Sequence, residues 1–222
     1  EKKTNEFMEE MDSVWVSLSA QIHEHINAFH RTRIEHVLAD TFALYPVEMI
    51  ADHLLIPLIG ELRGDGIGQI AKQAFFSNVL QEYLQAAIYR QRQAAQGEKI
   101  LLVSVYGNAV YSSNLESLLI NYSCLVYQYQ AEYLGHVDLK VAQVCAEALH
   151  AKIIVVIGYE TLNPGELQLH LKSWREKSAI PIVLTGNLAL VYPVLNLGEQ
   201  EAIYPCTTMQ QVHAALNQLV KG

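Results

Sequence analysis

The sequence predicts an α/β protein in which an N-terminal four-helix bundle precedes a flavodoxin-like domain with a five-stranded parallel sheet. Residues 1–95 contain no convincing strand, and their apolar side chains recur at steps of three and four, which is typical of amphipathic helices. After Gln96-Gly97-Glu98 the pattern changes to alternating strands and helices. Two of these strands, around 100–103 and 153–157, are apolar throughout, as in parallel sheets covered on both faces. We therefore predict a helical domain over 1–95 and a flavodoxin-like domain over 98–222.

The helical half is expected to begin with two amphipathic helices, over Phe7–Ile26 and Ile34–Leu44. Pro46 suits the first turn of a third helix, because its missing N–H would be unpaired there in any case. Pro57 lies deeper and is expected to kink that helix, unless the helix ends there. The glycine-rich turn at 64–68 then leads into a long fourth helix, roughly Gln69–Ala95.

The second half alternates strands and helices, which predicts a doubly wound sheet with its ligand crevice at the carboxyl ends of the strands. The expected strands are Ile100–Tyr106, Ala131–Leu134, Ile153–Gly158, Ile180–Thr185 and Ala202–Tyr204. The expected helices are Asn114–Tyr129, Leu139–His150, Gly165–Lys177, Leu188–Leu195 and Thr208–Val220.

Composition excludes several classes of protein. With 51% hydrophobic and 17% charged residues, the 222-residue chain can bury a sizeable core. A net charge of -8 with 15 Lys and Arg makes a stand-alone nucleic-acid binder a poor fit. There is no apolar run of membrane-spanning length and no visible signal peptide. Three widely spaced cysteines fit the reducing cytoplasm, and the missing initiator Met suggests part of a longer protein.

The order of bundle and sheet resembles the cobalamin-binding module, in particular the C-terminal sensory region of MerR-family transcriptional regulators of the CarH/LitR kind. The likeness is carried by Ile56-Pro57-Leu58-Ile59, by Gly64-Asp65-Gly66-Ile67, and by the order of elements after Gly97. It covers nearly the whole chain. The resemblance implies a homo-oligomer that contacts DNA only through an N-terminal domain not in this chain, and a light response through a partner photosensor protein is one implied input.

The cobalt-ligating pattern of that family is not kept. The family motif D/E-x-H-x-x-G falls on Ser112-Ser113-Asn114-Leu115-Glu116-Ser117, so Asn114 stands where the imidazole would be and Ser112 where its acidic partner would be. A carboxamide is a much poorer ligand for a transition metal than imidazole. The upper-face Trp and Glu-His pair are missing as well. We therefore expect no cofactor, with cobalamin or heme in unconventional ligation as alternatives.

The crevice remains the best place for a small ligand, whether it is empty, filled by side chains or occupied. Its candidate lining residues are Tyr106, Asn108, Ser112, Ser113, Asn114, Ser117, Gly158 and Gly186. The 12 tyrosines, several of them around the first strand, predict either ordinary packing or an aromatic pocket. No GxGxxG, GK[ST] or Gly-x-Ser-x-Gly motif is present, so neither nucleotide binding nor hydrolase chemistry is indicated.

Histidines are the other candidate ligands. His23, His25, His30 and His36 crowd one helix region, but their spacing does not close a metal site, and a solvated helix face is the simpler interpretation. For heme, any of His53, His136 or His150 would serve, and the sequence selects none of them.

Three functions are weighed on this basis. The first is a non-enzymatic sensory and oligomerisation region of a cobalamin-independent MerR-family regulator. The second is a cobalamin- or heme-binding photo- or redox sensor with unconventional ligation, and the third is a corrinoid carrier subunit of a methyltransferase. Burial of Val14, Trp15 and Leu18 against a partner would contribute to the expected oligomer, by about 1.5–3 kcal/mol per side chain.

Overall fold

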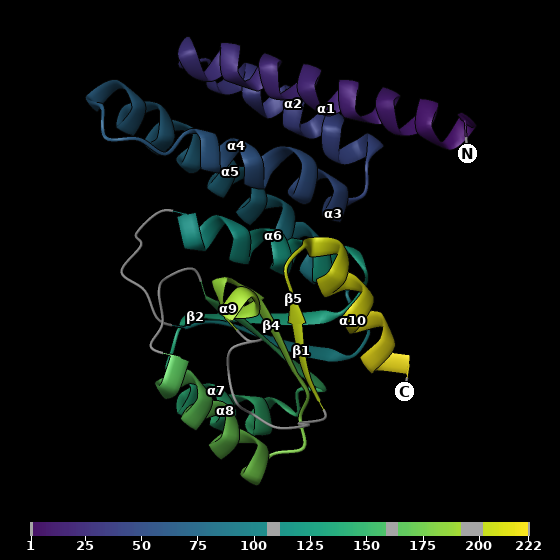
Figure 1. Cartoon of the computed structure of the whole chain (residues 1–222), viewed down its shortest axis with the longest axis vertical. Coiled ribbons are helices and arrows are strands. Elements are labelled where there is room, and N and C mark those ends of the chain that lie inside the picture. The colour runs from purple at the N-terminus through teal and green to yellow at the C-terminus, as the bar shows by residue number, and fades with distance from the viewer. Residues whose placement is uncertain (1, 106–111, 159–163, 192–201, 222) are drawn as a thin grey trace. The chain divides into compact units, whose positions relative to one another are not determined.

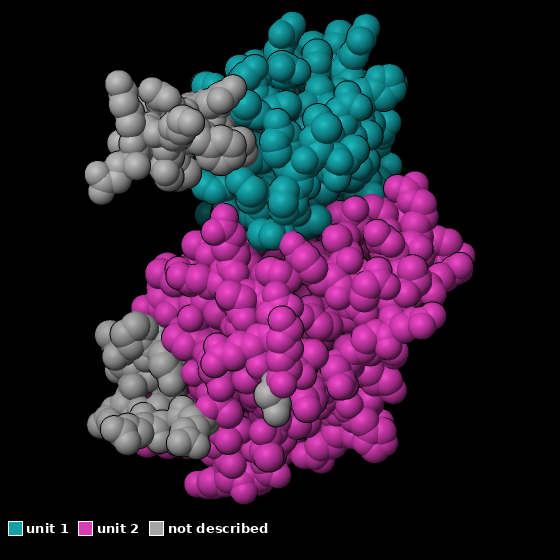
Figure 2. Space-filling model, turned by 90° about the vertical axis from the view of Figure 1, so that its right-hand side faces the viewer, with its two compact units in different colours: residues 1–84 teal, residues 85–222 magenta. Residues whose placement is uncertain are grey.

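The computed structural model describes residues 2–105, 112–158, 164–191 and 202–221. It divides into two compact units, residues 1–84 and 85–222, coloured separately in Figure 2. The fold is α/β: a helical N-terminal region and a five-stranded, all-parallel sheet with helices on both faces. The division falls inside one helix, α5 (Ile67–Arg92). None of the helices in the described ranges is both long and apolar enough to cross a membrane.

The helical region follows the predicted spacing, with buried residues such as Ile22, Ile34 and Leu38 at helical intervals. Its elements are α1 (Lys2–Asn27), α2 (Arg31–Leu44), α3 (Val47–Ile50), the π-helix η1 (Ala51–Leu55), α4 (Ile56–Glu61) and α5. Pro46 is the N-cap of α3, one position earlier than expected.

Pro57 does not end the helical run, and it lies in the first turn of α4. The run 47–61 stays helical but widens to a π-helix at Ala51–Leu55, directly before Pro57. Proline lacks an N–H and its ring crowds the carbonyl four residues earlier, which is that of His53. A wider turn at this point accommodates the proline without breaking the helix.

The sheet has the strand order β2-β1-β3-β4-β5, with every neighbouring pair parallel (Figure 1). This is the predicted flavodoxin-like order. The strands are β1 (Lys99–Ser104), β2 (Gln130–His136), β3 (Ile153–Gly158), β4 (Ile182–Gly186) and β5 (Ile203–Cys206). The helices between and after them are α6 (Ser112–Val126), α7 (Leu139–Leu149), α8 (Pro164–Lys177), α9 (Asn187–Val191) and α10 (Met209–Lys221).

Most boundaries agree with the prediction within two or three residues. β1 ends at Ser104 rather than at Tyr106, and Tyr106 lies outside the described residues. The short helix expected over 188–195 is described as far as Val191, and its remainder is outside the description.

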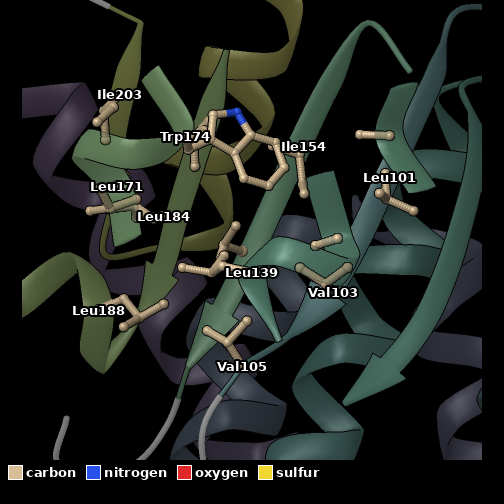
Figure 3. Packing of buried hydrophobic residues seen from close by; sticks show 14 of the residues in the cluster. Leu101, Val103, Val105, Leu139, Ile154, Leu171, Trp174, Leu184, Leu188 and Ile203 are labelled. Carbon is tan, nitrogen blue, oxygen red and sulfur yellow. The ribbon is translucent and has the colours of Figure 1, made fainter. Parts of the chain in front are cut away.

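Helices cover both faces of the sheet (Figure 1). Side chains from α7, α8 and α9 meet alternate strand residues in one apolar cluster, which Figure 3 shows around Trp174. Residues alternate between the faces of a strand, so Leu101, Val103 and Val105 belong to this cluster while Leu102 and Ser104 point to the α6 side. We call these the α7–α8 face and the α6–α10 face.

Candidate functional site

The carboxyl ends of β1, β3 and β4 lie at one edge of the sheet. β1 ends at Ser104, β3 at Gly158 and β4 at Gly186, and the register pairs Ser104 with Ile157 and Gly158 with Gly186. In open parallel sheets, ligands bind at this edge. These strand ends mark the edge at which the sequence predicts a ligand crevice, and the crevice itself stays a prediction.

A buried hydrogen-bonded group lies at this edge, between β1, β2 and α6. The hydroxyl oxygen of Ser104 is 2.9 Å from that of Ser117 on α6, and 2.9 Å from the hydroxyl of Tyr133 on β2. Ser104 and Ser117 are almost fully buried, at 1% and 0% exposure. The three hydroxyls thus form a small polar network inside an otherwise apolar layer.

Asn121 on α6 has one buried acceptor without a donor. It lies four residues after Ser117, so the two side chains occupy the same face of the helix. Asn121 is 2% exposed, and its Oδ1 has no hydrogen-bond partner. Leaving a buried acceptor unsatisfied costs about 1–3 kcal/mol. Such an atom is a candidate contact for a ligand that supplies a donor.

Thr185 places a further hydroxyl on the same face of the sheet. Ser104 pairs with Ile157, and Ile157 with Thr185, so the two polar residues stand in one row on alternate strands. With strands spaced at about 4.8 Å, they are roughly 10 Å apart. Among the residues with described side chains, every buried polar side chain is neutral, which favours amide or hydroxyl groups as partners over a charged phosphate. We call Ser104, Ser117, Asn121, Tyr133 and Thr185 the polar row.

The opposite face is closed at this edge. A Cβ placed on Gly158 would lie 2.6 Å from Cγ of Leu188, which is itself fully buried. Gly158 therefore serves close packing against α9, whereas the sequence had placed it in the ligand crevice. Gly186 follows with φ of 69°, a left-handed conformation that glycine adopts without strain.

The structure places some of the predicted crevice residues and leaves others outside its description. Ser117 is in the polar row, and its place in a ligand crevice stays a prediction. Ser112, Ser113 and Asn114 form the first turn of α6, but their side chains lie outside the description. Tyr106 and Asn108 lie outside the described residues altogether.

Ser104 and Asn121 were missed from sequence. Each is a polar residue inside an apolar run: Ser104 follows Ile-Leu-Leu-Val, and Asn121 follows Leu-Leu-Ile. Their position within apolar runs is the signal that could have identified them. Burying a polar side chain costs free energy, so a polar residue at a core position indicates a specific role.

One histidine lies near the polar row. His136 ends β2, is exposed, and is paired in register with Ser104 beside Gly135, whose φ is 75°. His150 instead follows α7 and precedes β3, at the amino edge of the sheet. The structure thus distinguishes two histidines that the sequence could not rank.

The tyrosines have mixed roles. Tyr133 belongs to the polar row, while Tyr129 donates to Oδ1 of Asn217 at 2.7 Å, and Tyr127 stacks on His213 with ring centroids 3.6 Å apart. Burial raises the pKa of the Tyr129 hydroxyl, and so does the neighbouring Cys124. Most of these rings pack α6 and α10 together rather than lining a pocket.

The cysteines and the histidine-rich helices show no metal-binding arrangement. Burial raises the pKa of Cys124 to about 12 and that of Cys206 to about 11, so both are held as neutral thiols. His23 is 2.8 Å from a carboxylate oxygen of Glu61 on α4. In the part of the chain that the structure describes, His, Cys, Asp and Glu side chains form no group of three or more suited to a metal ion.

The likeness of this chain to known proteins is one of structure. No protein-family model and no curated protein matches the chain. Among solved structures, it is similar to a cobalamin-binding protein from Desulfitobacterium hafniense DCB-2, at 15% identity and a TM-score of 0.45, over 91% of this chain and 98% of that one. It is also similar to the methanol:cobalamin methyltransferase complex MtaBC from Methanosarcina barkeri, at 10% identity and a TM-score of 0.45. This likeness covers 93% of this chain and 80% of that one.

These comparisons correct the expectation that no cofactor belongs to this chain. That expectation rested on the missing axial histidine, its missing acidic partner and the missing upper-face groups, whereas the two structures named above are a cobalamin-binding protein and a methanol:cobalamin methyltransferase complex. Loss of one metal ligand does not remove the remaining contacts that a large cofactor makes with a protein. These two structures do not show a MerR-family regulator.

Proposed function

We propose that this chain is a corrinoid-binding domain that takes its ligand at the carboxyl edge of the sheet, with the polar row as the inner contact. The observation that carries the proposal is the buried, unpartnered Oδ1 of Asn121, one helical turn from Ser117. The cofactor class follows from the sequence's resemblance to the cobalamin-binding module.

The polar row fits the periphery of a corrinoid better than its metal. Corrinoids carry neutral amide side chains, whose N–H groups can donate to Asn121 Oδ1, and the row is neutral throughout. Ser104, Ser117 and Tyr133 hold one another in place, so the site is organised before a ligand binds. When bound, the corrinoid supplies a cobalt centre that can exchange alkyl groups or respond to light.

The role of the domain is one of binding rather than catalysis. Within this proposal, two biological settings remain: a photo- or redox-sensing region, as in a MerR-family regulator, and a carrier subunit serving a methyltransferase. A sensor would change its association state when the loaded protein is illuminated, which light scattering measures. A carrier would keep its association state and accept a methyl group from a partner enzyme.

The binding test uses colour and co-elution. The purified chain is incubated with hydroxocobalamin or adenosylcobalamin and passed through gel filtration. We expect the corrinoid absorption to elute with the protein, and Asn121→Leu to weaken binding by about tenfold, which is 1.4 kcal/mol. Asn78→Leu makes the same exchange at an exposed site of α5 and should bind as wild type does. A colourless wild-type protein, or unchanged binding by Asn121→Leu, would contradict the proposal.

A second measurement asks whether the protein ligates cobalt. His136→Asn and His150→Asn remove one imidazole from each edge of the sheet. If His136 supplies the ligand, only the first variant will alter the absorption spectrum of bound hydroxocobalamin. If neither does, the corrinoid is held by its periphery alone.

A further inference from the structure

A groove lies wholly within the helical unit, between α1 and the run η1–α4. Its volume is about 360 Å³, which lies within the range of small-molecule sites. It is lined by Trp15, Val16, Ser19, Ala20, His23, His53, Leu54, Pro57 and Glu61. None of these residues belongs to the sheet unit.

The groove contains a fixed aromatic platform. Trp15 is 5% exposed and packs against Tyr45 with ring centroids 4.9 Å apart. The exposed ring of His53 stacks on Trp15, with centroids 5.8 Å apart and planes inclined by 14°. Trp15, expected from sequence to meet a partner chain, is thus buried within its own unit. The stack holds the imidazole of His53 flat at the groove wall.

The π-helix lies at this same wall. His53 is the central residue of η1, and Pro57, whose ring crowds the His53 carbonyl, also lines the groove. Single π-helical turns within α-helices occur frequently at functional sites. The irregular turn is thus located at the groove rather than elsewhere in the bundle.

Glu61 gives the groove its charge. One of its oxygens lies 2.8 Å from Nε2 of His23, and the other accepts no hydrogen bond from any described residue. Its side chain is 59% exposed, and it is the one Asp or Glu among the lining residues. In a protein with net charge -8, a cation would also be attracted over longer range.

We propose that this groove binds a small planar aromatic cation with a single ring or two fused rings. The ring stacks on His53, whose other face is supported by Trp15, and the N–H donors of the cation meet the carboxylate of Glu61. Val16, which is 70% exposed, and Pro57 supply apolar contact at the rim. This site is independent of the corrinoid proposal, because it belongs to the other unit.

The chain offers a direct optical test. It has two tryptophans, so Trp174→Phe leaves Trp15 as the sole indole reporter beside the groove. Benzamidine and benzoate are matched probes of nearly the same shape and opposite charge. At pH 8 we expect saturable quenching by benzamidine with a Kd of about 1 mM, a reasonable affinity for a fragment of this size. Benzoate should bind at least about tenfold more weakly, because Glu61 repels it.

Paired variants locate the site. His53→Ala and Glu61→Gln should each weaken benzamidine binding about fivefold or more, a typical loss for one stacking or charge-assisted contact. His25→Ala and Glu24→Gln make comparable changes on α1 outside the groove and should bind as the parent does. Saturation-transfer NMR on the wild-type chain provides the same comparison without relying on Trp174→Phe. Absence of saturable binding, equal binding of benzoate, or undiminished binding by both groove variants would overturn the proposal.

Discussion

The two faces of the sheet are built from alternate residues of the same strands and have opposite chemistry. The α7–α8 face is an apolar cluster that includes Leu171 and Trp174, and it is closed at the carboxyl edge by Leu188 on Gly158. The α6–α10 face carries the polar row, with the unpartnered Oδ1 of Asn121. Both faces are buried, so burial alone does not distinguish them. One face is thus closed by apolar packing, while the other keeps an unpaired hydrogen-bond acceptor.

The largest expected effect is on the α7–α8 face. Leu171→Ala should lower the free energy of unfolding by about 2–5 kcal/mol, because a fully buried side chain is replaced by a cavity. Leu169→Ala on the same helix is the control, since Leu169 is 69% exposed and should change stability by less than about 0.5 kcal/mol. Urea denaturation measures both. Equal effects at the two positions would show that α8 does not seal this face.

Gly158→Ala tests the closure at the carboxyl edge. The added methyl group would lie 2.6 Å from Cγ of Leu188, and relieving this overlap should cost about 1–3 kcal/mol. The double variant with Leu188→Ala should lose less stability than the two single variants added together, because the smaller side chain removes the overlap. A double-mutant cycle by thermal or urea unfolding gives the coupling. Strict additivity would mean that the two residues do not compete for space.

On the α6–α10 face, two substitutions should have different consequences. Ser104→Ala removes the shared partner of Ser117 and Tyr133 and should cost about 1–3 kcal/mol. Asn121→Leu removes an acceptor that is already unpaired, so stability should stay within about 0.5 kcal/mol or rise. Loss of corrinoid binding by Asn121→Leu without loss of stability would identify a residue retained for a ligand. A large destabilisation would instead assign it a structural role.

The smallest expected effect is a difference in alkylation rate between Cys124 on α6 and Cys145 on α7. Burial raises the pKa of Cys124 on α6 to about 12 from its ordinary value of 9.0, whereas Cys145 on α7 is only half-buried. Alkylation at pH 8, followed by peptide mass spectrometry, should therefore modify Cys145 first.

The raised pKa of Cys124 also fixes the sign of a pH effect. As the pH rises, the Cys124 thiol ionises in the unfolded chain before it ionises in the folded protein. The contribution of this thiol to the free energy of unfolding is therefore complete below about pH 9 and is lost as the pH rises toward about 12. Cys124→Ala should flatten this part of the stability profile. Rapid alkylation of Cys124 in the folded protein would contradict the burial on which both expectations rest.

The order of elements could be predicted because it depends on local spacing. Helical intervals in the first half and the apolar strand Ile153–Gly158 identified the fold class before any contact was known. The expected domain boundary near residue 97 stays a prediction. Pro57 was harder, since its effect depends on whether the preceding turn can widen, and η1 shows that it does.

The candidate site could be predicted only in part. Ser117, a predicted crevice residue, belongs to the polar row, whereas Gly158 packs against Leu188, because which face of β3 is covered depends on the helix that follows β4. The missing axial histidine at Asn114, its missing acidic partner and the missing upper-face groups together led to the expectation of no cofactor, which the comparisons corrected. Loss of the groups around the cobalt is weak evidence when a large ligand has many other contacts.

By itself, the sequence determined the helical first half and the strand–helix alternation of the second half. The tertiary structure alone decided that Ser104 meets Ser117 and Tyr133, 13 and 29 residues away, and that Trp15 supports His53. The physical reason is one of range. Backbone preferences and apolar periodicity act within a few residues, whereas hydrogen bonds and ring stacking join whichever side chains the fold brings within about 3–6 Å.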